Sequence, residues 1–203
     1  MKTLLIIVGV ILLAFITVQL FAWNGQRNIE TYPYQVNKKY NTFEIRSYEA
    51  SLFTSVRLSG NKYKDVSGQG FSILAGYIFG GNAKGEKIAM TSPVAMSLED
   101  SMTIMFMVPK KYKKETLPQP NQSQIEIRQE PAKTIAAITF GGWASDEKIE
   151  KYKQKLKSAL DAENITYTNR FYFLGYNPPY EVFNRKNEII VELESNTFDR
   201  INQ

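Results

Sequence analysis

The segment EIRSYEASLFTSVRLSG, residues 44–60, aligns without gaps on EIRQEPAKTIAAITFGG, residues 126–142. Both segments begin with Glu-Ile-Arg and both end on a glycine. Each one is typical of a strand, a break and a second strand, because apolar and β-branched residues alternate before the final glycine. A self-similarity of this kind predicts two related modules in tandem.

A helical pattern follows each of the two final glycines. In the first copy, apolar residues recur at helical spacing from Tyr63 to Ile78, although three glycines interrupt them. In the second copy the pattern runs from Ile149 to Leu160, with lysines and glutamates on the outer face and Ser145 as the expected N-cap. Glycines in the first helix either allow close packing or leave room for something that packs on it.

Each copy then closes with a predicted hairpin that a proline introduces. Pro93 in SPVAMSLEDSMTIMFMVP stands opposite Pro179 in PPYEVFNRKNEIIVELES. The turns are expected at residues 99–101 and 185–187, where polar residues gather. The returning strands are expected at Met102–Val108 and Glu188–Glu194. In the second of these, the alternation predicts Ile189, Val191 and Leu193 inward and Glu192 and Glu194 outward.

These patterns predict an α+β fold. Duplicated β-α-β-β modules, at about residues 34–110 and 124–195, would form a curved antiparallel sheet or open barrel with two flanking helices. The domain is expected over residues 34–200, after a linker at 24–33. A groove where two such modules meet is a usual place for a ligand.

The N-terminal residues 1–23 form a separate apolar segment. TLLIIVGVILLAFITVQLFAW, residues 3–23, carries no charged side chain and is long enough to cross a bilayer. Two interpretations remain, an uncleaved single-pass membrane anchor and a cleaved secretory signal, and we favour the anchor. By analogy with short-tailed signal anchors, we expect the folded domain outside the cytoplasm.

Composition excludes several classes of function. The net charge of +5 is mild, and PKKYKKE is the one basic run, so nucleic acid is not an expected partner. The chain has no histidine and no cysteine. Ser-His-Asp and Cys-His catalysis are therefore excluded, and a zinc site would lack its usual ligands.

Two further stretches carry a resemblance to a known family. GFSILAGYIFGGNAKGEKIAMTSPV, residues 70–94, resembles the SOUL haem-binding protein pattern of Gly-Phe, Leu-Ala, Tyr-Ile, Gly-x-Asn and Met-Thr-x-Pro-Val. YNPPYEVFNRKNEIIVEL, residues 176–193, resembles the C-terminal Tyr-x-Pro-Pro segment of that family. The resemblance spans about Tyr34 to Glu194.

The resemblance implies a duplicated fold, similar also to effector-binding domains of bacterial regulators. It further implies that a tetrapyrrole such as haem binds between the first helix, Lys62–Ile78, and the loop Pro178–Lys186. On this chain the residues expected to meet the ring are Phe71, Leu74, Ile78 and Tyr180. The cations expected to pair with propionates are Lys62, Lys64, Arg185 and Lys186.

This chain departs from haem-binding members that use an axial histidine, since it has none. Methionine and tyrosine are the other side chains that ligate haem iron. The methionines to consider are Met90, Met96, Met102, Met105 and Met107, and the tyrosines are Tyr77, Tyr176 and Tyr180. Because methionine is a common filler of cores, we favour packing for all five methionines, and likewise for the tyrosines; no residue is predicted as a metal ligand.

Two other functions stay open. Glu181 lies between aromatic residues, and a partly buried carboxylate there could act as the general base of a small-molecule hydrolase. The competing interpretation places Glu181 in solvent on an edge strand. The third function is a non-catalytic interaction module at the cell envelope, which predicts a groove blocked by side chains.

Overall fold

The computed structural model describes residues 1–26 and 29–194, with the side chains of residues 20–26 left out. Within these residues lie three helices, α1 (Lys2–Gln26), α2 (Tyr63–Ile78) and α3 (Asp146–Ala162). The strands are β1 (Tyr34–Lys39), β2 (Glu44–Tyr48), β3 (Ser51–Ser59), β4 (Val94–Ser97), β5 (Ser101–Met107), β6 (Ile125–Glu130), β7 (Lys133–Gly141), β8 (Tyr167–Gly175) and β9 (Lys186–Leu193).

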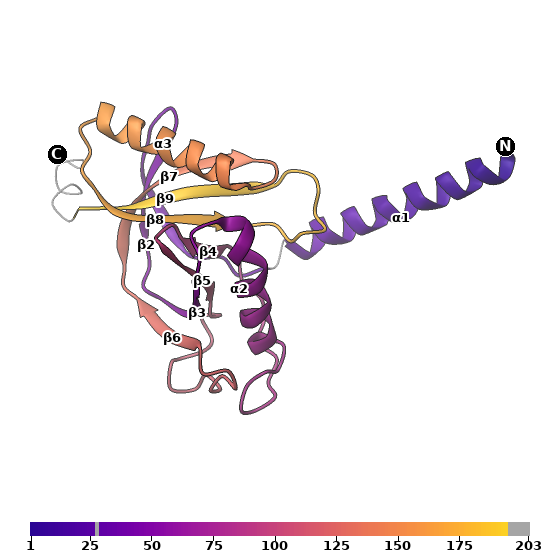
Figure 1. The fold of residues 1–203 in the computed structure, drawn as a ribbon, viewed down its shortest axis with the longest axis horizontal. Helices are drawn as coiled ribbons and strands as arrows, with labels where there is room; N and C mark the ends of the chain where they lie inside the picture. The colour runs from indigo at the N-terminus through magenta and orange to yellow at the C-terminus, as the bar shows by residue number, and fades with distance from the viewer. Residues whose placement is uncertain (27–28, 195–203) are drawn as a thin grey trace.

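The strands form one curled sheet in the order β1-β2-β7-β9-β8-β4-β5-β3-β6, with antiparallel neighbours throughout. The predicted α+β class and curved antiparallel sheet are therefore confirmed (Figure 1). The order strand, strand, helix, strand, strand occurs twice along the chain. The origin of the two halves by duplication stays a prediction.

The second predicted hairpin is wrong. Its turn was expected at residues 185–187, but β9 begins at Lys186 and pairs with β8, while residues 176–185 form a loop. Pro178 and Pro179 have no N–H to give to a strand ladder. Arg185 also ties this loop to itself through the carbonyl oxygens of Asn177, Pro178 and Glu181. The first hairpin, β4–β5, forms as predicted.

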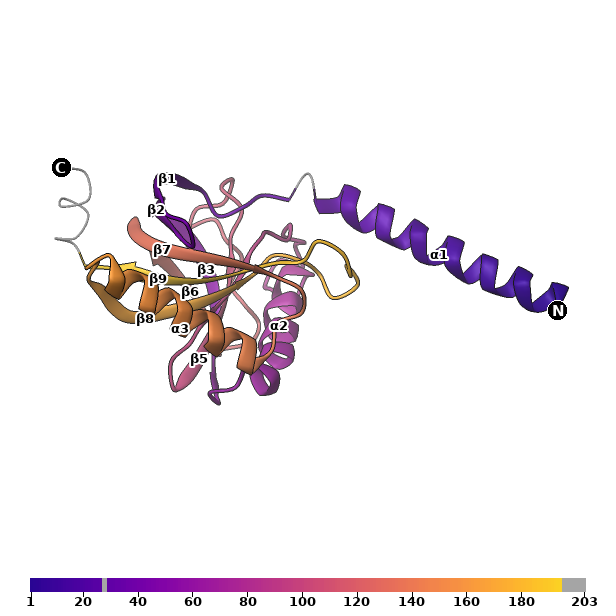
Figure 2. The same ribbon diagram turned by 90° about the horizontal axis from the view of Figure 1, so that it is seen from above.

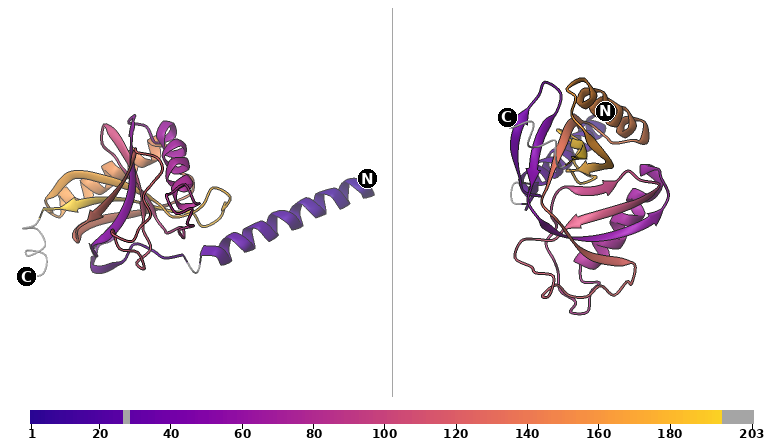
Figure 3. Two further views of the ribbon diagram at one scale, coloured as in Figure 1. Left: turned by 90° about the horizontal axis from the view of Figure 1, so that it is seen from below. Right: turned by 90° about the vertical axis from the view of Figure 1, so that its left-hand side faces the viewer.

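Both helices α2 and α3 cover the same face of the sheet, outside its curl (Figure 3). The first core joins Leu74 of α2 and Leu156 of α3 to sheet residues such as Ile189. Gly70 allows the close approach of α2, because a Cβ at this position would lie 2.5 Å from Ile104 Cδ1. The expected N-cap of α3 is confirmed, since Ser145 Oγ accepts the Lys148 N–H at 3.3 Å.

A second core fills the other face of the sheet. It contains residues such as Tyr48, Met105 and Ile190. Because successive side chains of a strand point to opposite faces, Ile189 enters the first core while Ile190 enters the second. Buried side chains therefore lie on both faces of β9, which leaves little of this strand exposed to solvent.

Helix α1 extends away from the curled sheet (Figure 2). Its residues Lys2–Gln19 form the one described segment that is long and apolar enough to cross a membrane, a criterion that a signal sequence also meets. The C-terminal part of α1 lies beside the loop 176–185. Its Gln19 is hydrogen-bonded to this loop.

Candidate ligand pocket

A pocket of about 700 Å³ lies between α2, the segment leading into β4, and the loop 176–185. Its walls are mostly apolar, with Phe71 of α2, Met90, Val94 of β4 and Phe173 of β8 among them. A volume of this size and a largely apolar wall are typical of small-molecule sites. The pocket lies where the sequence analysis placed the groove.

Two of the four residues expected to meet a ring line this pocket. Phe71 packs edge-on against Phe106 at 5.3 Å between ring centroids, and Tyr180 lies at the mouth. Leu74 and Ile78 lie on the face of α2 that packs on the sheet, where both are buried in the first core. Helix periodicity places Ser67 and Gly68, with Phe71, on the pocket side instead.

One of the four expected cations lines the pocket. Lys62 and Lys64 are exposed beyond its wall, and Lys186 forms an ion pair with Glu188 at 3.1 Å. Among the described residues of the wall, Arg185 is the only charged side chain. Its guanidinium lies 4.0 Å from the ring centroid of Trp143.

Three of the five N–H donors of Arg185 are used within the loop, which leaves one on Nη2 and the one on Nε. Its two terminal nitrogens donate to the three loop carbonyls named above, at 2.6–3.2 Å. Its Nε is buried and has no hydrogen-bond partner. Burial lowers the pKa of Arg185, with the nearby Tyr63 and Glu181 acting in the opposite direction. As the charged residue of the described wall, Arg185 would attract an anionic group of a ligand, whereas its buried Nε is not open to the cavity.

Three other polar side chains of the wall are already hydrogen-bonded within the protein. Thr91 Oγ1 donates to the Met107 carbonyl at 2.6 Å, and Ser92 Oγ donates to the Tyr176 carbonyl at 3.2 Å. Asn187 Nδ2 donates to the Gly142 carbonyl at 2.7 Å. These contacts leave an apolar surface toward the cavity, which suits a flat apolar ligand that carries few charges.

The candidate iron ligands divide into two groups. Met90, Met96, Tyr176 and Tyr180 line the pocket. Met102, Met105 and Met107 are buried in the two cores, where they pack as expected. Tyr77 is also buried away from the pocket and donates its hydroxyl to the Pro118 carbonyl at 2.7 Å; burial, with a smaller effect of Glu86, raises its pKa to about 12.

Glu181 does not line the pocket. It is buried, at 8 % exposure, within the loop 176–185 rather than on an edge strand in solvent. Among the described residues, no group of three or more acidic side chains is placed to hold a metal ion. The described part of the pocket wall therefore offers surface for binding but no carboxylate to act as a general base.

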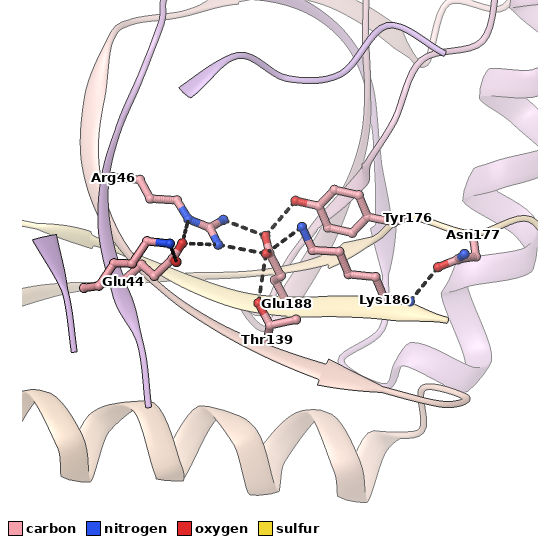
Figure 4. Close-up of polar contacts among 8 residues, drawn as sticks. Glu44, Arg46, Thr139, Tyr176, Asn177, Lys186 and Glu188 are labelled. Atoms are coloured by element: carbon pink, nitrogen blue, oxygen red, sulfur yellow. Dashed lines mark hydrogen bonds and ion pairs between the residues drawn. The ribbon is translucent and has the colours of Figure 1, made fainter. Parts of the chain in front are cut away.

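A polar cluster that the sequence analysis missed surrounds Glu188 of β9 (Figure 4). Arg46 of β2, 3 % exposed, forms two parallel hydrogen bonds at 3.0 Å with the carboxylate of Glu188 of β9, which is fully buried. Thr139 Oγ1 donates to Glu188 at 3.1 Å, and Tyr176 donates its hydroxyl at 2.6 Å. With Lys186, these residues form the Glu188 cluster.

The Glu188 carboxylate is held in its ionised form. Burial alone would raise its pKa, but the hydrogen bonds and charge of Arg46, with Lys186 and Tyr176, lower the pKa below its usual value. Burial of the Tyr176 hydroxyl, together with the negative charge of Glu188, raises the pKa of Tyr176. The hydroxyl therefore keeps its proton and remains a donor. Since Tyr176 lines the pocket and bonds Glu188, it connects the two regions.

Comparison with known proteins identifies the family. The profile of the SOUL heme-binding protein family matches residues 29–192. The chain belongs to this family. It is 30 % identical to Heme-binding protein 1 of Xenopus laevis over 156 residues, which cover 72 % of this chain and 81 % of that protein. Mouse Heme-binding protein 1 is 25 % identical over 80 % of this chain and 92 % of its own length.

Solved structures show a likeness of fold at low sequence identity. The C-terminal domain of EcmrR superposes with a TM-score of 0.60 at 12 % identity, covering 79 % of this chain and 98 % of that domain. A hydrolase from Listeria innocua gives a TM-score of 0.55 at 8 % identity, over 78 % of this chain and 94 % of the hydrolase. At such identities the likeness concerns the fold alone.

Proposed function

We propose that this SOUL-family chain binds haem or another tetrapyrrole non-covalently in the pocket beside α2, for carriage or buffering. The observation that carries the proposal is a mostly apolar cavity of about 700 Å³ in which Arg185 is the one charged residue of the described wall. A tetrapyrrole has a large apolar ring and carboxylates at one edge, which match these two features.

Phe71, Val94 and Phe173 would contact the ring faces, and Arg185 would receive a propionate. Of the pocket-lining candidates for an iron ligand, Met90 and Tyr180 remain, because Met96 is buried in the first core and the Tyr176 hydroxyl is bound to Glu188. When haem is bound, its iron supplies the redox and ligand-binding chemistry. The residues of this chain bind and orient the ring, and the proposal includes no catalytic step.

The proposal also includes membrane attachment through α1 as a single-pass anchor, with the folded domain outside the cytoplasm. The length and apolar character of residues 2–19 support the anchor. The repeated order of elements and the gapless alignment of residues 44–60 on 126–142 support a duplicated module.

The two other functions have less support. A hydrolase would need Glu181 in the pocket wall, where it does not lie, and an interaction module predicts a blocked groove, whereas the pocket is open.

Hemin titration of the full chain in detergent tests the binding proposal. We expect a shifted Soret band and quenching of tryptophan fluorescence, because Trp143 lies in the pocket wall. Gly68 also lines the pocket, and a Cβ there meets nothing within 4 Å. Gly68→Phe should therefore fill the cavity and weaken hemin binding by about tenfold or more, roughly 1.4 kcal/mol.

Gly76→Phe is the matched control. Gly76 is an exposed glycine of the same helix with equally open surroundings, but it lies outside the pocket wall. Its variant should bind hemin as the parent chain does. Equal affinities for the two phenylalanine variants would place the ligand elsewhere, and a parent chain without any Soret shift would remove haem as the ligand.

A further inference from the structure

Exposed apolar side chains gather at the mouth of the pocket. Outside α1, the described large apolar residues that are exposed are Val36, Phe79, Trp143, Tyr180, Val182 and Phe183. Three of these, Phe79, Trp143 and Tyr180, line the pocket, and Val182 and Phe183 belong to its loop. We call the set Phe79, Trp143, Tyr180, Val182 and Phe183 the apolar rim. Apolar patches of this kind mark an interaction surface.

Helix α1 lies against this rim. Gln19 Nε2 donates to the Tyr180 carbonyl at 3.0 Å, and Gln19 Oε1 accepts the Val182 N–H at 3.2 Å. The ring of Phe15 packs edge-on against Phe183 at 6.3 Å between centroids. Figure 2 shows the loop beside the end of the helix that is closer to the sheet. These contacts place the tip of the loop at one end of the candidate span.

The positions of these contacts along α1 indicate how deep the loop would lie in the bilayer. Phe15 precedes Gln19 by four residues, so Phe183 lies about 6 Å further along the span than the Gln19 contacts, at ~1.5 Å per residue. Interfacial apolar groups enter a bilayer by ~5–10 Å. Tyr180, at the level of Gln19, would then lie among the headgroups, where tyrosine and tryptophan are enriched.

We infer that the apolar rim docks on the lipid bilayer that α1 spans, so that the pocket opens toward the membrane. Ile29, three residues after the end of α1, lines the pocket, which places the cavity directly after the span in sequence as well. Ligands would then enter and leave through the bilayer, and the ligand class is an amphiphile that partitions into lipid. This inference rests on the proposed anchor, but it does not require that the ligand be haem.

Depth-dependent quenching of a single tryptophan tests the docking. The full chain with Trp23→Phe and Trp143→Phe receives Phe183→Trp and is reconstituted in phosphatidylcholine vesicles. Doxyl groups near the headgroup end of the acyl chain should quench Trp fluorescence strongly, and groups near the methyl end weakly. The matched control places the probe at Val36, the exposed apolar residue outside the rim, where emission should stay red and unquenched.

The possible results distinguish three claims, namely the docking of the apolar rim, the anchor and haem as the ligand. Red, unquenched emission from the position 183 probe overturns the docking, and blue-shifted, unquenched emission overturns it in favour of a second copy covering the rim. Release of the chain from vesicles by an alkaline wash overturns both the anchor and the docking. Quenching at position 183 in a chain that gives no Soret shift supports the docking while removing haem as the ligand.

Transfer kinetics give a second measurement. Val182→Ser with Phe183→Ser removes apolar surface from the tip of the loop, outside the pocket wall. If the pocket exchanges ligand through lipid, transfer of hemin between the full chain and vesicles should slow by about tenfold while the hemin affinity in detergent stays unchanged. An unchanged transfer rate would overturn exchange through the bilayer.

Discussion

The pocket and the Glu188 cluster lie on opposite sides of one strand and differ in how their polar groups are satisfied. Asn187 of β9 lines the pocket, whereas its neighbour Glu188 enters the cluster. In the cluster, Arg46, Thr139, Tyr176 and Lys186 surround one buried carboxylate with hydrogen bonds and ion pairs. In the pocket, Arg185 keeps N–H donors that no loop carbonyl accepts, beside an open apolar cavity.

This difference indicates that the cluster stabilises the sheet and that the pocket is left for a ligand. A closed network of buried charges is sensitive to the removal of any member. An open cavity tolerates added side chains, but an added side chain occupies the space of the ligand. The predictions below test this division in order of expected size.

Loss of Arg46 should have the largest effect. Arg46→Met leaves Glu188 buried with only the half-exposed Lys186 as a countercharge, and breaking a buried pair costs about 3–5 kcal/mol. Urea unfolding of the full chain followed by circular dichroism measures the change. The double variant Arg46→Met with Glu188→Leu should recover part of the loss, since no buried carboxylate is then left without a cation, Lys186 is half-exposed and Glu44 keeps Lys39. A single variant as stable as the parent would contradict a structural role for the cluster.

Added volume on the packed side of α2 should come next. Gly70→Ala places a Cβ 2.5 Å from Ile104 Cδ1, and overpacking of this kind costs about 1–3 kcal/mol. Thermal unfolding measures the loss, and Ile104→Val in the same chain should restore part of it. If Gly70→Ala were neutral, the contact between α2 and β5 would be looser than the structure shows.

The Glu188 cluster should also make the free energy of unfolding depend on pH. The pKa of Glu188 is lowered in the folded state, so its contribution is present above its unfolded pKa and is lost as the pH falls through the folded value. Unfolding titrations between pH 7 and about pH 3 should therefore show declining stability below about pH 4.3. Glu188→Gln should show a flatter profile over that window. Parallel profiles for the two chains would assign the acid sensitivity to other carboxylates.

The smallest effect is expected on the pocket side of α2. Gly68→Ala adds a Cβ that meets nothing within 4 Å and should stabilise the helix by up to about 1 kcal/mol. Gly76→Ala, in equally open surroundings, is the matched control and should give a similar gain. If Gly68→Ala lowered the stability while Gly76→Ala did not, the space beside Gly68 in the pocket would be smaller than the structure shows.

Patterns within a short stretch of sequence predicted the bounds of helix α2 and the N-cap of α3. Helix α2 covers Tyr63–Ile78, the range over which the helical pattern was found, and Ser145 caps α3. Both depend on spacing within a few residues, which a sequence shows directly. Arg185 and Phe71 could be placed at the pocket because the family resemblance fixed which helix and loop face each other.

Contacts between distant strands could not be predicted in this way. Arg46 and Glu188 are 142 residues apart and meet only because β2 and β9 both pair with β7. The alternation in β9 predicted one buried face, with Ile189 and Val191 inward. Because the sheet curls and a second core fills its other face, Glu188 is buried as well, and no local period indicates that second layer.

The strand order has a consequence for how the chain folds. β2 lies beside β7, and β3 lies beside β6, so each half of the chain supplies neighbours to the other. Until residues 125–141 have been synthesised, the edge of β2 that pairs with β7 and the edge of β3 that pairs with β6 have no partner. Long-range pairing of this kind slows folding, and unpaired edges are prone to aggregation. We therefore expect the sheet to form late, after nearly the whole chain has emerged from the ribosome, and to benefit from chaperones during that interval.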